Sequence, residues 1–315
     1  MSDEQGGWAG FGWQSWTDLA GVRARLAAGA EPAFLLRSLE RPLDLAAEHG
    51  SVEVVAELAA RVGDVDAMSL GRTALWRAVF GNRAENARAL VAAGADPSRP
   101  MMAGWSPERL SLAGPHPLTA GTSLSATEQA AAAEGQRLTA VLDDLPIEDL
   151  SLACVAGIDA AEAIRRLAAE IVPADSVTED DMWAYPMSND TELTLWATSV
   201  PGGCVLTQPW GYGASMPGVV TRLSVGTKCY AMYANPKSGD QGSTARNGEI
   251  TGWDLHPGGF PDEHDAADEI LASYLYQRNA VAYSCASTGL RPNDCRAFTG
   301  PPDHWLRLPD GDYWH

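Results

Sequence analysis

Short runs of apolar residues at helical spacing, separated by glycine-containing turns, fill the first half of the chain. One pair of runs begins at Arg41 and turns at Gly50, and a second pair begins at Thr73 and turns at Gly81. Residues three and four apart share one face of a helix, so each pair predicts two short antiparallel helices. Glycine between the helices suits the left-handed backbone that ends many helices. The apolar positions of the first pair are Leu43, Leu45, Ala46, Ala47, Val54, Val55 and Leu58.

The two pairs are copies of one unit. Leu43 matches Leu75 at an offset of 32 residues, and Ser106 follows Thr73 after 33 residues. Both hydroxyl residues are placed to cap the helix that follows them. A partial unit precedes the pairs at residues 19–32, and another begins at Ser106. In spacing and in these residues, the stretch 16–115 resembles the ankyrin repeat.

The resemblance implies an all-α array, closed by a helix expected at residues 126–142, that binds protein partners through its turn tips and its inner-helix face. Arg41 departs from the family pattern, which has a capping threonine there. Asp44, Trp76 and Arg109 stand where the family has a histidine, so we expect a less uniform array. Trp76 and Phe80, four residues apart, form a core pair in the alternative interpretation. The positions expected to face a partner are Asp44, Glu48, Arg72, Trp76, Arg77, Phe80 and Trp105.

Beyond Ile147 the pattern changes to alternating residues with frequent glycine and tryptophan. Asp159 is placed to cap an amphipathic helix, and residues 263–279 predict a second one. Gly/Ser-rich residues 235–248 are typical of a mobile loop. We therefore predict two domains, 1–146 and 147–315, the second an α+β domain with an antiparallel meander and two helices. The expected strands cover residues 192–198, 203–208, 219–224, 228–234 and 249–255.

The second half is similar to an uncharacterised α+β domain family of actinobacteria, which implies a bacterial source and no known activity. The similarity rests on residues 154–157, the helix at 161–166, Trp210-Gly211 and residues 223–227. Residues 247–249 and 257–261 complete it.

Composition and charge narrow the function. The formal net charge is −19, and Lys228 and Lys237 are the only lysines. Such a chain is repelled by phosphate backbones and anionic lipids, so we expect neither nucleic acid nor membrane as a partner. The acidic start lacks the apolar region of a signal peptide, so we expect a cytoplasmic protein with reduced thiols.

Tryptophan is unusually frequent near both ends, with 11 in the chain against 5 phenylalanines. Burial of each large ring is favourable, so we expect both terminal arms to fold back and pack rather than serve as anchors for a partner. The terminal tryptophans are Trp8, Trp13, Trp16, Trp305 and Trp314.

Two sets of residues carry candidate chemistry. Cys285 and Cys295 lie near Asp303 and His304 in sequence, but no signature of a thiol enzyme surrounds them. The acidic and histidine residues from Asp254 to Asp265 could hold a divalent ion. We favour the simpler interpretation, in which the acids complement a helix dipole, and we expect no metal or other cofactor. The members of this second set are Asp254, His256, Asp262, His264 and Asp265.

The leading hypothesis is a protein-binding adaptor that engages a protein partner, with a basic toxin or enzyme as one concrete candidate, in a salt-sensitive complex. The alternative is an enzyme or ligand-binding protein with a pocket in the second domain. The residues expected to line that pocket are Trp210, Tyr212, Arg222, Tyr230, Trp253 and Asp254.

Overall fold

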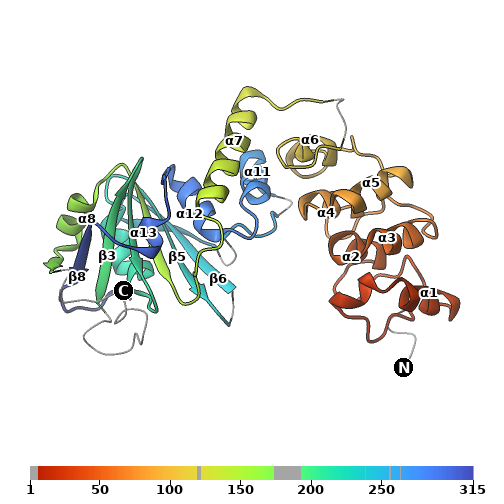
Figure 1. Cartoon of the computed structure of the whole chain (residues 1–315), viewed down its shortest axis with the longest axis horizontal. Coiled ribbons are helices and arrows are strands. Elements are labelled where there is room, and N and C mark those ends of the chain that lie inside the picture. The colour runs from red at the N-terminus through yellow and green to blue at the C-terminus, as the bar shows by residue number, and fades with distance from the viewer. Residues whose placement is uncertain are drawn as a thin grey trace. The chain divides into compact units, whose positions relative to one another are not determined.

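The computed structural model describes residues 6–118, 122–173, 193–237, 239–254, 257–262 and 264–314. The chain forms two compact units (Figure 1). The helical unit comprises Met1–Ala132 together with Pro261–Leu275, and the sheet unit comprises Ala133–Phe260 and Tyr276–His315. Helices therefore combine with an antiparallel sheet, which confirms a mixed α and β fold.

Short helices stacked in pairs build the helical unit. Helix α2 contacts both its neighbour α3 and the next first helix, α4, while α3 contacts α5 (Figure 1). Each pair thus buries its apolar face on the next pair, as the sequence pattern predicts. The bounds are α1 Leu19–Ala27, α2 Pro42–His49, α3 Val52–Ala59, α4 Ala74–Phe80, α5 Ala84–Ala92, α6 Pro107–Ser111 and α11 Ala267–Leu275, with 3-10 turns η2 Trp13–Thr17 and η3 Met102–Gly104. Helix α7, Ala126–Val141, begins in the helical unit and continues into the sheet unit.

The predicted helix caps are confirmed. Thr73 Oγ1 accepts a hydrogen bond of 3.1 Å from the Trp76 amide, and Ser106 Oγ accepts one of 3.2 Å from the Arg109 amide. Each bond satisfies an amide that has no partner inside the helix.

The expected role of the turn glycines is wrong. Gly50 has φ −86° and Gly81 has φ −77°, so neither is left-handed. At the second turn, Asn82 takes that conformation instead, with φ 55°. Gly50 is needed for close approach, because a Cβ there would lie 2.6 Å from the carbonyl oxygen of Ala46.

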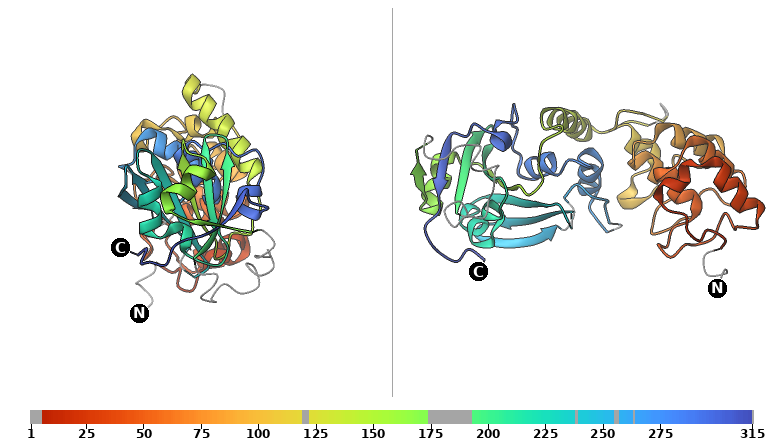
Figure 2. Two further views of the ribbon diagram at one scale, coloured as in Figure 1. Left: turned by 90° about the vertical axis from the view of Figure 1, so that its left-hand side faces the viewer. Right: turned by 60° about the horizontal axis from the view of Figure 1, so that its bottom comes forward.

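An eight-stranded antiparallel sheet forms the centre of the sheet unit (Figure 2). Its order is β2-β8-β3-β4-β1-β5-β6-β7. Because β8 pairs with β2 and β3, the end of the chain completes one side of the sheet. The bounds are β1 Ser151–Ala156, β2 Glu170–Val172, β3 Thr194–Val200, β4 Gly203–Gln208, β5 Lys228–Asn235, β6 Gly239–Arg246, β7 Glu249–Asp254 and β8 His304–Arg307.

Helices cover both faces of this sheet. Alternate residues of a strand point to opposite faces. In β1, Ala153 and Val155 belong to a core with α8 (Ala160–Leu167) and α10 (Pro217–Leu223). The intervening Cys154 faces the other way, and its Sγ lies 3.8 Å from that of Cys285 in α12. The remaining helical segments are α12 Ala280–Thr288, α13 Arg296–Thr299 and η5 Gly213–Ser215.

Several elements differ from the sequence prediction. Residues 219–224, expected as a strand, lie mostly in α10, where Pro217 takes the first helical position. The expected loop 235–248 contains β6. Residues 263–279 do not form one helix, because α11 ends at Leu275 and α12 begins at Ala280. The sheet unit thus holds more than the two helices expected.

Candidate functional site

Most of the side chains expected to face a partner are buried inside the helical unit. Arg72 is half-buried, and the other six are nearly inaccessible to solvent. Six of the seven therefore act in packing, and the prediction that they form an open binding surface is wrong for them. The buried six are Asp44, Glu48, Trp76, Arg77, Phe80 and Trp105.

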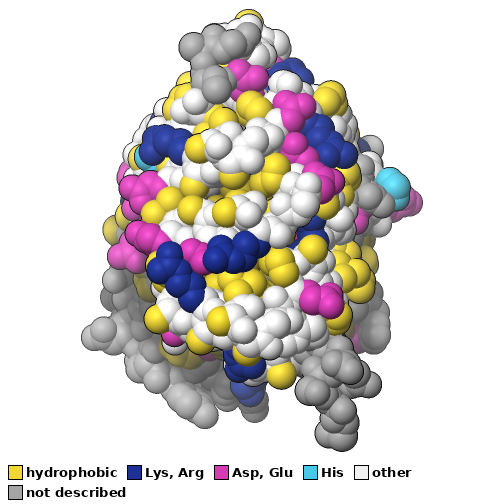
Figure 3. Space-filling model, turned by 90° about the vertical axis from the view of Figure 1, so that its right-hand side faces the viewer, with side chains coloured by type: hydrophobic (Ala, Val, Ile, Leu, Met, Phe, Trp, Pro, Cys, Tyr) yellow, Lys and Arg dark blue, Asp and Glu magenta, His cyan; other side chains and the backbone are white. Residues whose placement is uncertain are grey.

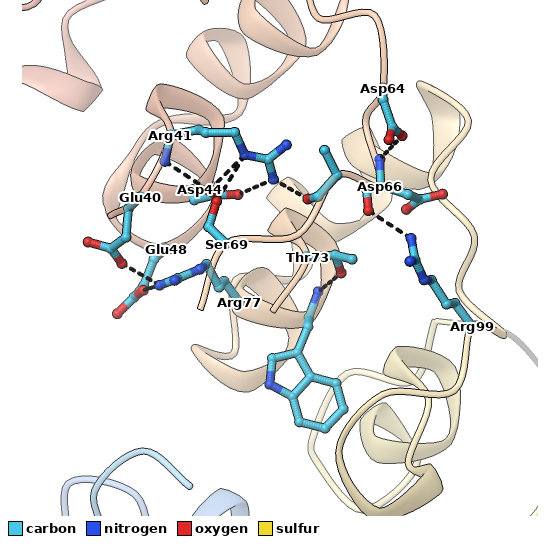
Figure 4. A network of polar contacts seen from close by, with 12 residues as sticks. Glu40, Arg41, Asp44, Glu48, Asp64, Asp66, Ser69, Thr73, Arg77 and Arg99 are labelled. Carbon is cyan, nitrogen blue, oxygen red and sulfur yellow. Dashed lines mark hydrogen bonds and ion pairs between the residues drawn. The ribbon is translucent and has the colours of Figure 1, made fainter. Parts of the chain in front are cut away.

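Asp44 is held in a buried ion pair (Figure 4). Its carboxylate accepts hydrogen bonds from the Arg41 guanidinium and from the Arg41 amide, at 2.9–3.1 Å. The same guanidinium donates to Ser69 Oγ at 3.1 Å and to the carbonyl oxygen of Ala67. Arg41 therefore joins two successive turns of the stack.

A second buried arginine lies between two glutamates (Figure 4). Arg77 Nη1 lies 2.5 Å from Glu40 Oε1 and 3.2 Å from Glu48 Oε2. Among the described residues, its Nε and Nη2 have no hydrogen-bond partner. Removing a partner from a buried charge is costly, so these acids are held by structure rather than free for a ligand.

Residues from late in the sequence cover the aromatic side chains. The Phe80 ring lies 5.7 Å from that of Tyr274. Trp105 Nε1 donates a hydrogen bond of 2.8 Å to the carbonyl oxygen of Ala267. The core-pair interpretation of Trp76 and Phe80 is confirmed, since both rings lie in the core of this unit.

In contrast to these buried residues, two leucines in successive turns of the helical unit are exposed to solvent. Leu39 is 54% exposed and Leu70 is 52% exposed. Both adopt the left-handed conformation, with φ 62° and φ 52°, and Ala103 repeats it in the third turn with φ 45°. Leu35 and Met68 are also about half exposed. The turn surface is defined here as Leu35, Leu39, Met68 and Leu70.

Hydrogen bonds between turns hold the turn surface together. Arg41, which follows the first turn, bonds to Ser69 of the second. Arg99 of the third turn donates to the Asp66 carbonyl oxygen at 2.8 Å and to Met68 Sδ at 3.4 Å. The exposed apolar side chains therefore stand on a connected framework. On the face shown in Figure 3, apolar side chains lie between arginine and acidic side chains.

A small pocket adjoins the first of these turns. Its volume is about 270 Å³, below the usual range for drug-sized ligands. Leu36 and Ser38, which flank the turn, contribute to its wall. Leu45 and the aromatic side chains of the N-terminal arm contribute further apolar lining, the aromatic residues being Trp8, Phe11, Trp13 and Trp16.

The alternative pocket residues of the sheet unit fall into separate groups of contacts. Tyr230 donates a hydrogen bond of 2.8 Å to Asp254. Burial, and then the charge of Asp254, raises the pKa of Tyr230 strongly, so this hydroxyl stays neutral. Trp253, on the neighbouring position of β7, is 67% exposed.

The C-terminal tail contacts two more of these residues. The Tyr212 ring lies 4.2 Å from Tyr233 and 5.7 Å from Trp314. The Arg222 guanidinium stacks 4.8 Å from the centre of the Tyr313 ring. The remaining residue, Trp210, has φ 55° and a buried Nε1 without a hydrogen-bond partner among the described residues.

The cysteines and acids do not assemble a metal centre in the part of the chain described. Cys285 is buried against Cys154, and Cys295 accepts a weak hydrogen bond from Thr299. His256 lies outside the described residues, and the others include no group of three or more His, Cys, Asp or Glu able to hold a metal. Asp265 instead accepts a hydrogen bond of 2.7 Å from the Asp262 amide.

No family model matches the chain, and no curated protein matches its sequence significantly. Among the described residues, no helix combines the length and the apolar character that crossing a membrane requires.

Proposed function

We propose that the protein is a binding adaptor whose ankyrin-type helical unit engages a protein partner through the turn surface. The observation that carries the proposal is the pair of exposed leucines, Leu39 and Leu70, each left-handed and each in one of two successive turns of the helical unit. Left-handed backbone costs a non-glycine residue about 1–2 kcal/mol, and exposure of the side chain brings no compensating burial. A strained and exposed apolar residue, present twice, supports a role in recognition.

The proposed partner is a basic protein. The net charge of −19 would attract it and would orient the encounter. The turn surface would then supply the apolar contact, because a binding site places apolar anchors inside a polar rim. Neutralisation of a basic toxin or regulation of a basic enzyme in the bacterial cytoplasm fits this chemistry.

A pair of glycine substitutions tests the turn surface. In the variant Leu39→Gly/Leu70→Gly, glycine relieves the left-handed strain, so we expect stability to hold or to rise by about 1 kcal/mol. Partner binding should weaken at least tenfold, because both apolar anchors are lost. The partner would be captured from a lysate of the source organism at low salt, identified by mass spectrometry, and titrated against both chains.

Asp144→Gly provides the matched control. Asp144 is exposed and left-handed, with φ 51°, but it lies in the sheet unit. The control should keep full affinity for the partner. Equal affinity in the double-leucine variant would overturn the proposed site, and a complex indifferent to salt would overturn the electrostatic part.

The alternative function, an enzyme or small-ligand pocket in the sheet unit, gains no support from the contacts described. Tyr230 and Asp254 bond to each other, and the raised pKa of Tyr230 makes it a poor proton donor or acceptor. We therefore put forward the adaptor alone.

A further inference from the structure

Strand β7 is the last in the order of the sheet, and in the described part of the chain it pairs with β6 alone (Figure 2). The strand at the opposite edge, β2, has three residues, whereas β7 has six. Short strands, lysine and proline are devices that keep a sheet edge from pairing with another chain. The sequence of β7, EITGWD, contains neither lysine nor proline. This edge is therefore long enough to pair with a further strand.

The hairpin turn between β6 and β7 determines which backbone groups of β7 face away from the sheet. Two residues connect the strands, Asn247 and Gly248, both with positive φ. In such a turn the flanking pair, Arg246 and Glu249, is hydrogen bonded, and bonded pairs alternate with unbonded pairs from there along β6. Trp253 lies opposite the third residue before Arg246, so it falls in an unbonded pair. Its amide and carbonyl groups therefore point away from β6.

Contacts at both ends hold β7 in place. At its start, the Gly248 amide donates a hydrogen bond of 3.1 Å to Ser224 Oγ. At its end, the Tyr230 hydroxyl donates one of 2.8 Å to Asp254. Helix α10 contacts β7 as well. A strand that is fixed beforehand loses little conformational freedom when another strand pairs with it, so this edge is preorganised.

The side chains of β7 define what an added strand must carry. Alternate residues, Glu249, Thr251 and Trp253, are exposed, and Trp253 is 67% exposed. In an added strand, a β-branched residue opposite Trp253 and a basic residue opposite Glu249 form favourable cross-strand pairs. Acids stand at both ends of β7, Glu249 and Asp254, and the net charge is −19. A second copy of the chain brings the same charges, so electrostatics favours a basic strand over self-pairing.

We propose that the edge of β7 binds an extended segment of a basic protein by adding it to the sheet as a further strand. Main-chain hydrogen bonds supply the affinity, and the pairs made with Trp253 and Glu249 select the segment. The edge belongs to the sheet unit, whereas the turn surface belongs to the helical unit, so this inference does not depend on the function proposed above.

The probe is the fluorescein-labelled peptide Lys-Thr-Val-Thr-Val-Thr-Lys, titrated against the full chain and followed by fluorescence anisotropy. Because the backbone groups of Trp253 point outward, the valine opposite it pairs with it through hydrogen bonds. N-methylation of both valines should therefore weaken binding at least tenfold. N-methylation of two threonines, whose amides point away from β7, should leave the affinity unchanged.

Two substitutions of one residue separate the backbone from the ring. Trp253→Ala removes the ring and keeps the amide, whereas Trp253→Pro removes both, at an edge position where proline is tolerated. We expect the alanine variant to bind the peptide more weakly than the wild-type chain, and the proline variant to bind at least tenfold more weakly than the alanine variant. Trp13→Ala removes an equally exposed ring from the helical unit, so it should keep full affinity.

Three results would overturn strand addition at this edge: no binding to the wild-type chain, equal binding of the proline and alanine variants, or equal weakening by the two N-methylated peptides. If circular dichroism shows that the proline variant is unfolded, the two N-methylated peptides decide on the wild-type chain. Equal affinity for a peptide with glutamate in place of both lysines would refute the basic partner.

Light scattering tests the other occupant of the edge, a second copy of the chain. We expect the wild-type chain and the proline variant to have the same mass in solution. A wild-type dimer that becomes a monomer in the folded proline variant would show that the edge pairs with itself, which would overturn the occupant proposed.

Discussion

The cysteines differ sharply in their surroundings. Burial raises the pKa of Cys204 to about 12, and it raises the pKa of Cys154 and Cys229 as well. Cys285 is also buried, whereas Cys295 is partly exposed. A thiol reacts as its thiolate, so a buried thiol with a raised pKa is inert.

We therefore expect one of the five thiols to react with Ellman's reagent in the native chain at pH 8, and all five in denaturant. Cys295→Ser should abolish the native reaction and leave four thiols in denaturant. Rapid reaction of two or more thiols without denaturant would contradict the burial described.

Because the pKa of Cys204 is raised, we also expect the folded chain to lose stability in alkali. Its pKa is about 12 in the folded chain against 9.0 for the free thiol, so above pH 9 the unfolded state releases a proton that the folded state keeps. Stability is fully present below pH 9 and falls by about 1.4 kcal/mol per pH unit per such group up to pH 12. Urea unfolding between pH 9 and 11 measures how steeply the free energy of unfolding falls with pH. In Cys204→Ala this fall should be smaller than in the wild-type chain by the same amount per pH unit, and an equal fall in both chains would contradict the raised pKa of Cys204.

Single-residue predictions succeeded where the partner is close in sequence. Thr73 and Ser106 cap helices whose amides lie three residues away, and Asp159 accepts from the Glu162 amide at 2.8 Å in the same way. The burial of Arg77 escaped prediction because its partner Glu40 is 37 residues distant. A sequence read locally shows a charged residue but not the opposite charge that permits its burial.

At the scale of elements, apolar alternation predicted some strands and failed for others. The expected strand 203–208 matches β4, whereas β6, with the polar sequence GDQGSTAR, was expected as a loop. Its strand conformation comes from hydrogen bonding to β5 and β7 on either side. Conversely, Val219 and Val220 have high strand propensity but lie in α10. Tertiary context decides such segments.

Two glycines of the sheet differ in how much space their surroundings leave for an added methyl group. A Cβ on Gly203 of β4 would lie 1.9 Å from the carbonyl oxygen of Val155 in β1, whereas one on Gly252 of β7 would meet only Thr244 Oγ1, at 3.1 Å. We expect Gly203→Ala to lower the free energy of unfolding by about 2–4 kcal/mol and Gly252→Ala by less than about 1 kcal/mol. Urea unfolding of both variants measures the difference, and similar losses would contradict this packing.

At the scale of the whole molecule, the terminal tryptophans show how the arms are used. Trp8 and Trp16 are buried with rings 5.4 Å apart, and Trp8 Nε1 donates to the Glu31 carbonyl oxygen at 2.8 Å. Trp305 pairs with Trp196 across β8 and β3. The expectation of packed arms is confirmed for these rings. It is wrong for Trp13 and Trp314, which remain more than half exposed.

Deletion of residues 1–17 should lower the melting temperature, because it removes two buried indole rings and each contributes a few kcal/mol. Trp13→Ala is the control within the arm, since its ring is 68% exposed, and it should change stability by less than about 0.5 kcal/mol. Calorimetry of the two proteins gives the comparison. Equal melting of the deletion and the wild type would refute a structural role for the arm.

The assignment of Pro261–Leu275 to the helical unit had no signal in the sequence. Its helical pattern was visible at residues 263–279, but periodicity does not say which apolar surface a helix will cover. The segment is held by hydrogen bonds from Arg72 to Pro261 and from Trp105 to Ala267. Both pairs are more than 160 residues apart in the sequence.

This late segment has a consequence for protein synthesis. A ribosome makes the stacked pairs of the helical unit first, and it makes α11, which packs on them, later: Ala267 follows its contact Trp105 after 162 residues. At roughly 5–20 residues per second, the interval is on the order of ten to thirty seconds. Throughout it, Phe80 and Trp105 lack the neighbours that bury them. A nascent chain of this protein is thus a candidate client for chaperones that recognise exposed aromatic side chains, until α11 covers Phe80 and Trp105.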